Sequence, residues 1–107
     1  MEIKITDQIN ELSRADIDQL KGSIMLEFGA RWCGYCQAAQ SIITSSIVNC
    51  PHIRHIKIED GRGRRLGRSY SVKLWPTLIF IKNGIEIKRL VRPVDSDEVA
   101  NALELIS

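Results

Sequence analysis

The chain has 107 residues, of which 44% are hydrophobic and 26% charged, and its formal net charge is +2. A chain of this length suits one globular domain, which we expect over residues 1–107, and this composition argues against disorder. The mild positive charge does not by itself indicate a nucleic-acid or membrane partner, and no apolar run approaches the length of a membrane-spanning helix.

The N-terminal residues and the cysteines bear on the cellular compartment. The first ten residues, MEIKITDQIN, lack the positive patch and apolar stretch of a secretory signal, so we expect a cytoplasmic protein. Three cysteines are too few, and odd in number, for a secreted disulfide framework. In a reducing compartment, the closely spaced Cys33 and Cys36 indicate redox exchange or metal binding rather than a structural crosslink.

The first half of the chain predicts a βαβ unit. Residues 24–28, IMLEF, indicate a buried strand that contains one carboxylate, Glu27. From Cys36 onward, apolar residues at three- and four-residue spacing predict a helix that runs from about the CxxC motif, residues 33–36, to near Asn49. Residues 52–58 predict a second strand, and the helix between the two strands makes a parallel pair the expected arrangement.

The second half predicts a hairpin followed by a helix. Residues 77–91 hold two β-rich segments joined through Asn83-Gly84, a dipeptide typical of tight hairpin turns. Asp95 is the expected N-cap of the last helix, with Glu98 three residues later. One face of this helix is apolar and should pack on the sheet, through Val99, Ala102, Leu103 and Ile106.

These elements and motifs resemble the thioredoxin family across nearly the whole chain. The matching segments are WCGYC at 32–36, WPT at 75–77, the KNG turn at 82–84, and an acidic residue six positions before the first cysteine, Glu27. The resemblance implies a thioredoxin fold of the α/β class, with three α/β/α layers around a mixed sheet of four to five strands. Its parts would be the βαβ unit and a C-terminal ββα unit.

The resemblance also implies an activity, thiol–disulfide exchange. We expect a dithiol reductase of protein disulfides that needs no cofactor and acts in redox homeostasis and electron transport. The expected partners are protein disulfide substrates and a reductant of the thioredoxin-reductase type or another dithiol. We expect a monomer, with no membrane partner and no nucleic-acid partner.

The placement of the two cysteines explains why they suit this chemistry. Cys33 should lie at a helix N-terminus, where unpaired N–H groups and the helix dipole lower the pKa of a thiol. Arg31 either adds a nearby cation or points to solvent. Cys36 lies one turn further on and can attack a mixed disulfide formed at Cys33, whereas two inert structural thiols are a disfavoured alternative at a helix start.

Glu27 stands in an apolar strand, where an ionised carboxylate without a partner is unfavourable. We therefore expect a raised pKa and a partly neutral group, or support from water; the alternative is a side chain that points to solvent. The resemblance assigns it a catalytic role, relaying protons to and from the resolving thiol. His52 and His55 are interpreted as plain strand residues, with contact between His55 and Glu27 as the less favoured alternative.

The segment around Pro76 is the expected substrate side of the site. Pro76 can open a strand without losing a sheet hydrogen bond. The resemblance implies a cis Trp75-Pro76 bond that faces Cys33, offers backbone groups to an extended substrate and keeps metals from the thiols. The substrate contacts that it implies are Trp32, Gly34, Tyr35, Trp75, Pro76 and Arg92.

Three features depart from the usual family pattern. Gly34-Tyr35 stands between the cysteines in place of Gly-Pro, which leaves the redox potential open. Gly29 stands where a bulky aromatic residue is common. Arg92 lies near a position where the family usually has a glycine lining the substrate groove. We expect Arg92 to crowd or charge that groove and to favour acidic partners.

Other readings of the remaining residues stay open. Cys50 is interpreted as a small buried hydrophobe rather than a third redox residue. A noncatalytic interaction module is one alternative function, and zinc binding is another, with the candidate ligands Cys33, Cys36, Cys50, His52 and His55. A basic cluster indicates a solvated loop and short helix, or else a phosphate, nucleic-acid or acidic-protein contact; its members are Arg62, Arg64, Arg65 and Arg68.

Overall fold

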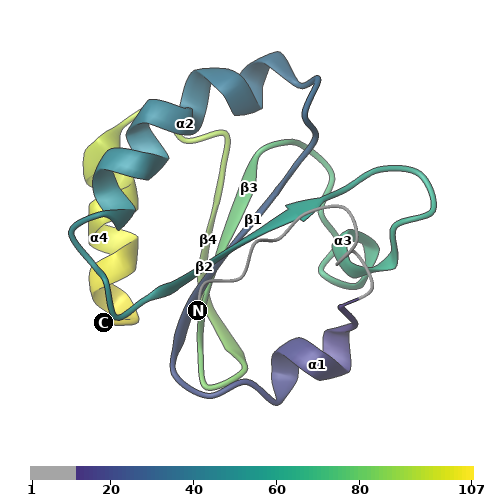
Figure 1. Ribbon diagram of the computed structural model, residues 1–107, viewed down its shortest axis with the longest axis horizontal. Coiled ribbons are helices and arrows are strands. Elements are labelled where there is room, and N and C mark those ends of the chain that lie inside the picture. The colour runs from purple at the N-terminus through teal and green to yellow at the C-terminus, as the bar shows by residue number, and fades with distance from the viewer. Residues whose placement is uncertain (1–11) are drawn as a thin grey trace.

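A computed structural model describes residues 12–107 of the protein (Figure 1). The N-terminal segment that led us to expect a cytoplasmic protein lies outside these residues. Among the described residues, no helix is long and apolar enough to cross a bilayer. The helices and strands follow in the order α1 (Arg14–Asp18), β1 (Ser23–Gly29), α2 (Gly34–Ile47), β2 (Arg54–Glu59), α3 (Arg65–Ser69), β3 (Thr77–Lys82), β4 (Ile85–Val91) and α4 (Ser96–Leu105).

The strands form one four-stranded sheet in the order β2-β1-β3-β4. Strand β1 pairs parallel to β2 and antiparallel to β3, and β3 pairs antiparallel to β4. Because β1 has a neighbour on each edge and helices over both faces, its side chains are almost all buried, as its apolar sequence predicts. The predicted βαβ unit and the hairpin through Asn83-Gly84 are confirmed.

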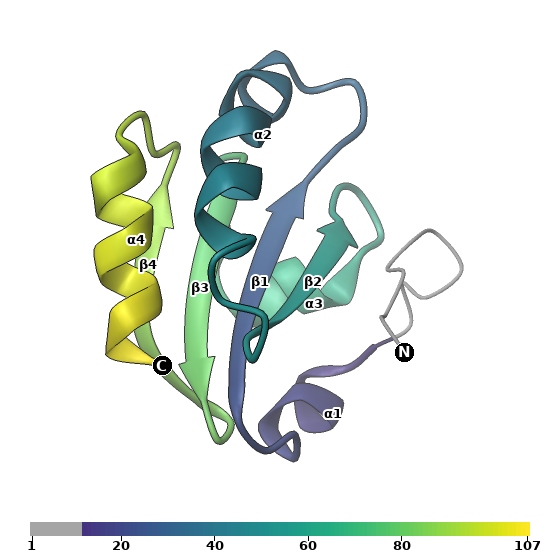
Figure 2. The same cartoon turned by 60° about the vertical axis from the view of Figure 1, so that its left-hand side comes forward.

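Helices cover both faces of the sheet. In Figures 1 and 2, α2 and α4 lie on one face and α1 and α3 on the other, which confirms the predicted three layers. Side chains of β1 alternate between the two cores: Phe28 packs with residues of α1 and α3, and Met25 with residues of α2 and α4. Glu27 follows the same alternation, and its side chain therefore lies on the α2 face.

The two longer helices begin where their capping residues predict. Cys33 is the N-cap of α2, because its sulfur accepts a hydrogen bond from the amide of Cys36. Asp95 is the N-cap of α4 and accepts from the amide of Asp97. The predicted apolar stripe of α4 is buried, whereas α2 ends at Ile47, slightly before the predicted boundary.

The chain brings three separate segments together at one end of the sheet (Figure 2). Phe28, near the end of β1, pairs with Thr77 at the start of β3, and Thr77 pairs with Val91 at the end of β4. The amide of Arg92 also donates to the carbonyl of Pro76 at 2.8 Å. The start of α2, the loop before β3 and the end of β4 therefore border one site.

Candidate active site

Cys33 lies at the start of α2, as predicted, and its side chain is only 5% exposed. Burial alone would raise its pKa. Hydrogen bonds from the Cys36 thiol and from the amides of Cys36 and Tyr35, together with the charge of Arg92, oppose burial and bring the pKa of the Cys33 thiol below its ordinary value. This is the property that a thiolate nucleophile requires.

Cys36 has the opposite electrostatics. Burial raises the pKa of its thiol to about 12, with further contributions from the hydrogen bond to Cys33 and the negative charges of Cys33 and Glu27. Gly29 makes space for this sulfur, because a Cβ atom added at Gly29 would lie 2.6 Å from Cys36 Sγ. A side chain at Gly29 would therefore require the sulfur of Cys36 to move.

Glu27 is buried, with 3% of its surface exposed, and its charge acts on Cys36, so the alternative of a solvent-facing carboxylate is wrong. Its two oxygens have separate partners. His55 Nε2 lies 2.7 Å from Oε1, and Gln40 Nε2 donates to Oε2 at 2.7 Å. The interpretation of His55 as a plain strand residue is also wrong, because β2 presents it on the same sheet face as Glu27.

These partners reverse the expected pKa of Glu27. Burial raises the pKa of the carboxyl group, as we expected from the sequence. The hydrogen bond and charge of His55, the hydrogen bond from Gln40 and the charge of Lys57 together outweigh burial, and the pKa lies below its ordinary value. Glu27 is therefore ionised at neutral pH, and because an ionised carboxylate only accepts, His55 Nε2 must carry the hydrogen that it shares.

The loop before β3 faces the cysteines. The Trp75-Pro76 bond is cis, as the resemblance implied. Trp75 packs against the small cluster of Ala30, Cys33 and Cys36, and its ring meets that of Trp32 edge-on at 5.3 Å between centroids. Trp75 Nε1 donates to Asp60 Oδ2 at 2.9 Å, which fixes the orientation of the indole.

Arg92 closes the other side of the site. Its Nε donates to the carbonyl of Trp75 at 2.8 Å, and its guanidinium carbon lies 3.8 Å from the centre of the Tyr35 ring. Arg92 thus lies beside Trp75 and Tyr35, where the sequence led us to expect a side chain that crowds or charges the groove. The sequence did not predict that Arg92 would be a cation that lowers the pKa of Cys33.

Two residues of the site were missed by the sequence analysis. Gln40 could have been found, because it follows Cys36 by four positions on the same helix face and so lies above the strand that carries Glu27. Asp60 carries no comparable signal. It follows the end of β2, and only the fold brings it to the indole of Trp75.

The candidate zinc ligands do not form a cluster. His52 Nε2 lies 3.0 Å from the hydroxyl of Ser107, and Cys50 is half-buried against the core under α2 and α4. Within residues 12–107, no group of three or more histidine, cysteine or acidic side chains could hold a metal ion. The geometry gives the zinc alternative no support in that part of the chain.

Comparison with known proteins identifies relatives of this architecture. A family model described as thioredoxin matches residues 5–105. Thioredoxin from Chlamydia trachomatis is 33% identical over 86 residues, which cover 80% of this chain and 81% of that protein. The solved structure of reduced thioredoxin 2 from Pseudomonas aeruginosa superimposes with a TM-score of 0.84 at 42% identity, covering 99% of this chain and 96% of that one.

Proposed function

Because the chain belongs to the thioredoxin family and is a thiol–disulfide oxidoreductase, we propose that it reduces protein disulfides through Cys33 and Cys36. One observation carries the assignment of roles. The two thiols stand at one helix start with pKa values shifted in opposite directions, lowered for Cys33 and raised for Cys36. Cys33, which ionises readily, suits the role of the nucleophile. Cys36, which stays protonated, suits the role of the resolving thiol that reacts only after the mixed disulfide has formed.

The exchange has two balanced steps. Cys33 thiolate attacks one sulfur of the substrate disulfide, so that a Cys33–substrate disulfide forms and one substrate thiolate leaves and takes up a proton. Cys36 then loses its proton and attacks Cys33 Sγ, which closes the Cys33–Cys36 disulfide and releases the second substrate thiol. The substrate gains two electrons, and a separate reductant must return two electrons to the protein.

Glu27 is the proposed acceptor of the Cys36 proton. Its carboxylate is ionised before the reaction and lies close enough for its charge to raise the pKa of Cys36. Once Cys33 is bound in a mixed disulfide, its negative charge and its hydrogen bond no longer hold the proton on Cys36. Deprotonation of Cys36 toward Glu27 then becomes easier in the step that needs it.

Polypeptide disulfides are the proposed substrates. Large apolar side chains are exposed on the three segments that border the site, and a flexible chain could cover them; they are Trp32 (75% exposed), Tyr35 (60%), Leu74 (47%), Val91 (48%) and Val94 (84%). The proposed reductant is a protein of the thioredoxin-reductase type or another dithiol. We further propose that the chain acts as one domain and a monomer in the cytoplasm, where its three thiols would stay reduced.

Trapping the intermediate tests these roles. Cys36→Ser should accumulate disulfide adducts with partner proteins at Cys33, because nothing resolves the mixed disulfide. The adducts are measured on nonreducing gels and by mass spectrometry. Cys33→Ser/Cys36→Ser is the matched control and should carry none, while Cys36→Ser/Cys50→Ser should retain them. If Cys36→Ser stays free of adducts, the assigned roles are wrong and a noncatalytic interaction module becomes the better explanation.

A further inference from the structure

Arg92 occupies a backbone conformation that arginine rarely adopts. Its φ is 53°, in the left-handed region that glycine adopts readily and in which other residues are strained. A backbone hydrogen bond from Arg92 to the carbonyl of Pro76 holds this conformation. Residues with strained backbone cluster at functional sites, so the guanidinium of Arg92 is a candidate for binding a ligand.

The guanidinium lies between the Trp75 carbonyl and the Tyr35 ring, close enough to Cys33 for its charge to act there, and is only partly engaged. Its Nε donates to the Trp75 carbonyl, and its face lies on the ring of Tyr35. An arginine has five N–H donors, and a planar carboxylate can accept two of them side by side. In the described part of the chain, no carboxylate forms an ion pair with Arg92. The charge nevertheless acts at the site, because it lowers the pKa of Cys33.

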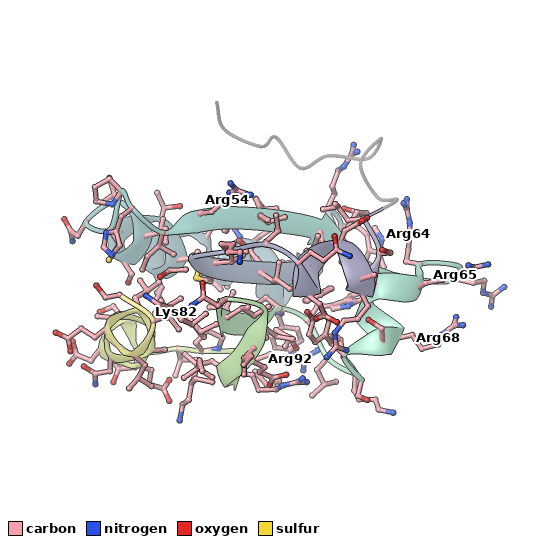
Figure 3. All side chains as sticks on the ribbon, turned by 90° about the horizontal axis from the view of Figure 1, so that it is seen from below. Arg54, Arg64, Arg65, Arg68, Lys82 and Arg92 are labelled. Atoms are coloured by element: carbon pink, nitrogen blue, oxygen red, sulfur yellow. The ribbon has the colours of Figure 1, made fainter. Side chains whose placement is uncertain are left out.

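More positive charge lies near Trp75. A shallow pocket of about 310 Å³ is lined by Trp75, Asp60 and four cations, Arg62, Arg64, Arg68 and Lys73. The side chains of Arg64 and Arg68 extend outward from the region of α3 (Figure 3). The one carboxylate in this lining already accepts the indole hydrogen of Trp75. Trp75 therefore contacts Arg92 through its carbonyl and also lines this basic pocket.

We propose that this site selects disulfides in acidic polypeptide segments, and that Arg92 is the specificity-determining residue that binds a carboxylate next to the attacked sulfur. The inference rests on the proposed exchange activity and names its substrate class. The basic pocket that Trp75 lines binds or attracts further acidic residues of the same segment. Charge complementarity at Arg92 and at this pocket is the physical basis of the preference.

The contact between Arg92 and Trp75 also explains why a neutral substrate is disfavoured. A polypeptide amide that donates to the Trp75 carbonyl must share that oxygen with Arg92 Nε or displace it. A substrate carboxylate gives the displaced guanidinium a new partner, and a neutral or basic substrate leaves it without one. Arg92 thus favours acidic segments by attraction and disfavours the others by competing with them at the Trp75 carbonyl.

The test compares three quenched-fluorescence peptides with one disulfide each. The residues next to the cysteines are glutamate, glutamine or lysine, and the rest of each peptide is the same. Reduced wild type, Arg92→Gln, Arg92→Lys and Arg54→Gln react with each peptide under single-turnover conditions. Arg54 is the matched control, because it is an exposed arginine at the start of β2 and lies far from Arg92 (Figure 3).

The ratio of glutamate-peptide to lysine-peptide rates is the deciding readout. It cancels any general loss of reactivity that follows when Arg92 no longer lowers the pKa of Cys33. We expect wild type to favour the glutamate peptide about tenfold, and Arg92→Gln to lower this ratio below about threefold. Arg92→Lys should keep part of the preference, and Arg54→Gln should keep all of it. The wild-type ratio should fall when ionic strength rises from about 0.01 M to about 1 M.

Two results would overturn the inference while the exchange activity stands. Equal rates for all three peptides with wild type would show that the site does not discriminate between substrates by their charge. A preference that survives in Arg92→Gln and disappears in Arg64→Gln/Arg68→Gln would move the selectivity from Arg92 to the basic pocket. Failure of the proposed function is distinguishable, because wild type would then reduce none of the peptides, the neutral one included.

Discussion

The hydrogen bond between His55 and Glu27 should contribute measurably to stability, and His55→Ala tests it. The substitution leaves a buried carboxylate with one partner fewer. Hydrogen bonds to charged groups contribute about 1.5–3 kcal/mol. The Glu27 side chain is 4% exposed and that of His55 is 23% exposed, so water can replace the lost donor only in part. We expect His55→Ala to lower the free energy of unfolding at pH 7 by about 2 kcal/mol, or Tm by about 8–16 °C.

The pH dependence of this loss follows from the direction of the Glu27 shift. The pKa of Glu27 is lower in the folded protein than its ordinary value, so the unfolded chain binds the proton more tightly. The stabilisation is therefore fully present above the ordinary carboxyl pKa, and it disappears as the pH falls through the folded value. Below both values Glu27 is protonated in either state, and the difference between wild type and His55→Ala should shrink.

Urea unfolding under reducing conditions measures this difference at pH 7 and at several values between about 5 and 3. His52→Ala is the matched control, because His52 is exposed and bonds only the hydroxyl of Ser107 among the described residues. It should change stability by less than about 0.5 kcal/mol. Equal losses in the two variants, or a loss from His55→Ala that is the same at every pH, would refute the reasoning.

Three further predictions concern the cysteines and their surroundings. In the reduced protein, alkylation followed by mass spectrometry should label Cys33 at neutral pH and leave Cys36 unlabelled, since the pKa of Cys36 is about 12; equal labelling would contradict the shifts. Gly29→Ala should destabilise the reduced protein to urea by about 1–3 kcal/mol, because its Cβ would lie 2.6 Å from Cys36 Sγ. Gly34→Ala, whose Cβ meets nothing within 4 Å, should not, and similar losses in both would count against a specific clash. Glu27→Gln should slow the second exchange step and flatten its pH profile in stopped-flow measurements, and an unchanged profile would exclude the proton-relay role.

Most of the fold could be predicted because its signals are local. The apolar run of β1, the spacing along α2 and α4, and Asn83-Gly84 each depend on a few neighbouring residues. The two cysteines could be placed for the same reason, since a helix start is visible in sequence. The cis Trp75-Pro76 bond came from the family resemblance rather than from the residues alone.

The lowered pKa of Cys33 could be predicted from its place at a helix start, but the electrostatics of Glu27 and Arg92 could not, because they depend on segments that meet only in the folded chain. The expectation of a raised pKa for Glu27 considered burial alone. The fold adds His55 from β2 and Gln40 from α2, and these partners reverse the sign. Arg92 is a similar case, since only the meeting of the β4 end with the α2 start brings it onto Tyr35.

Cys33 is both the N-cap of α2 and one of the two redox cysteines. The stability of the first turn of α2 therefore depends on the redox state of this pair. The sulfur of Cys33 can accept the Cys36 amide hydrogen as a full anion only in the dithiol form, because closing the disulfide removes the charge. The hydrogen bond therefore stabilises the reduced form relative to the disulfide. This raises the midpoint potential by about 30 mV for each 1.4 kcal/mol of stabilisation. Taken by itself, this hydrogen bond makes the Cys33–Cys36 disulfide a better electron acceptor than it would be without the cap, so the first turn of α2 is one of the features that tune the potential.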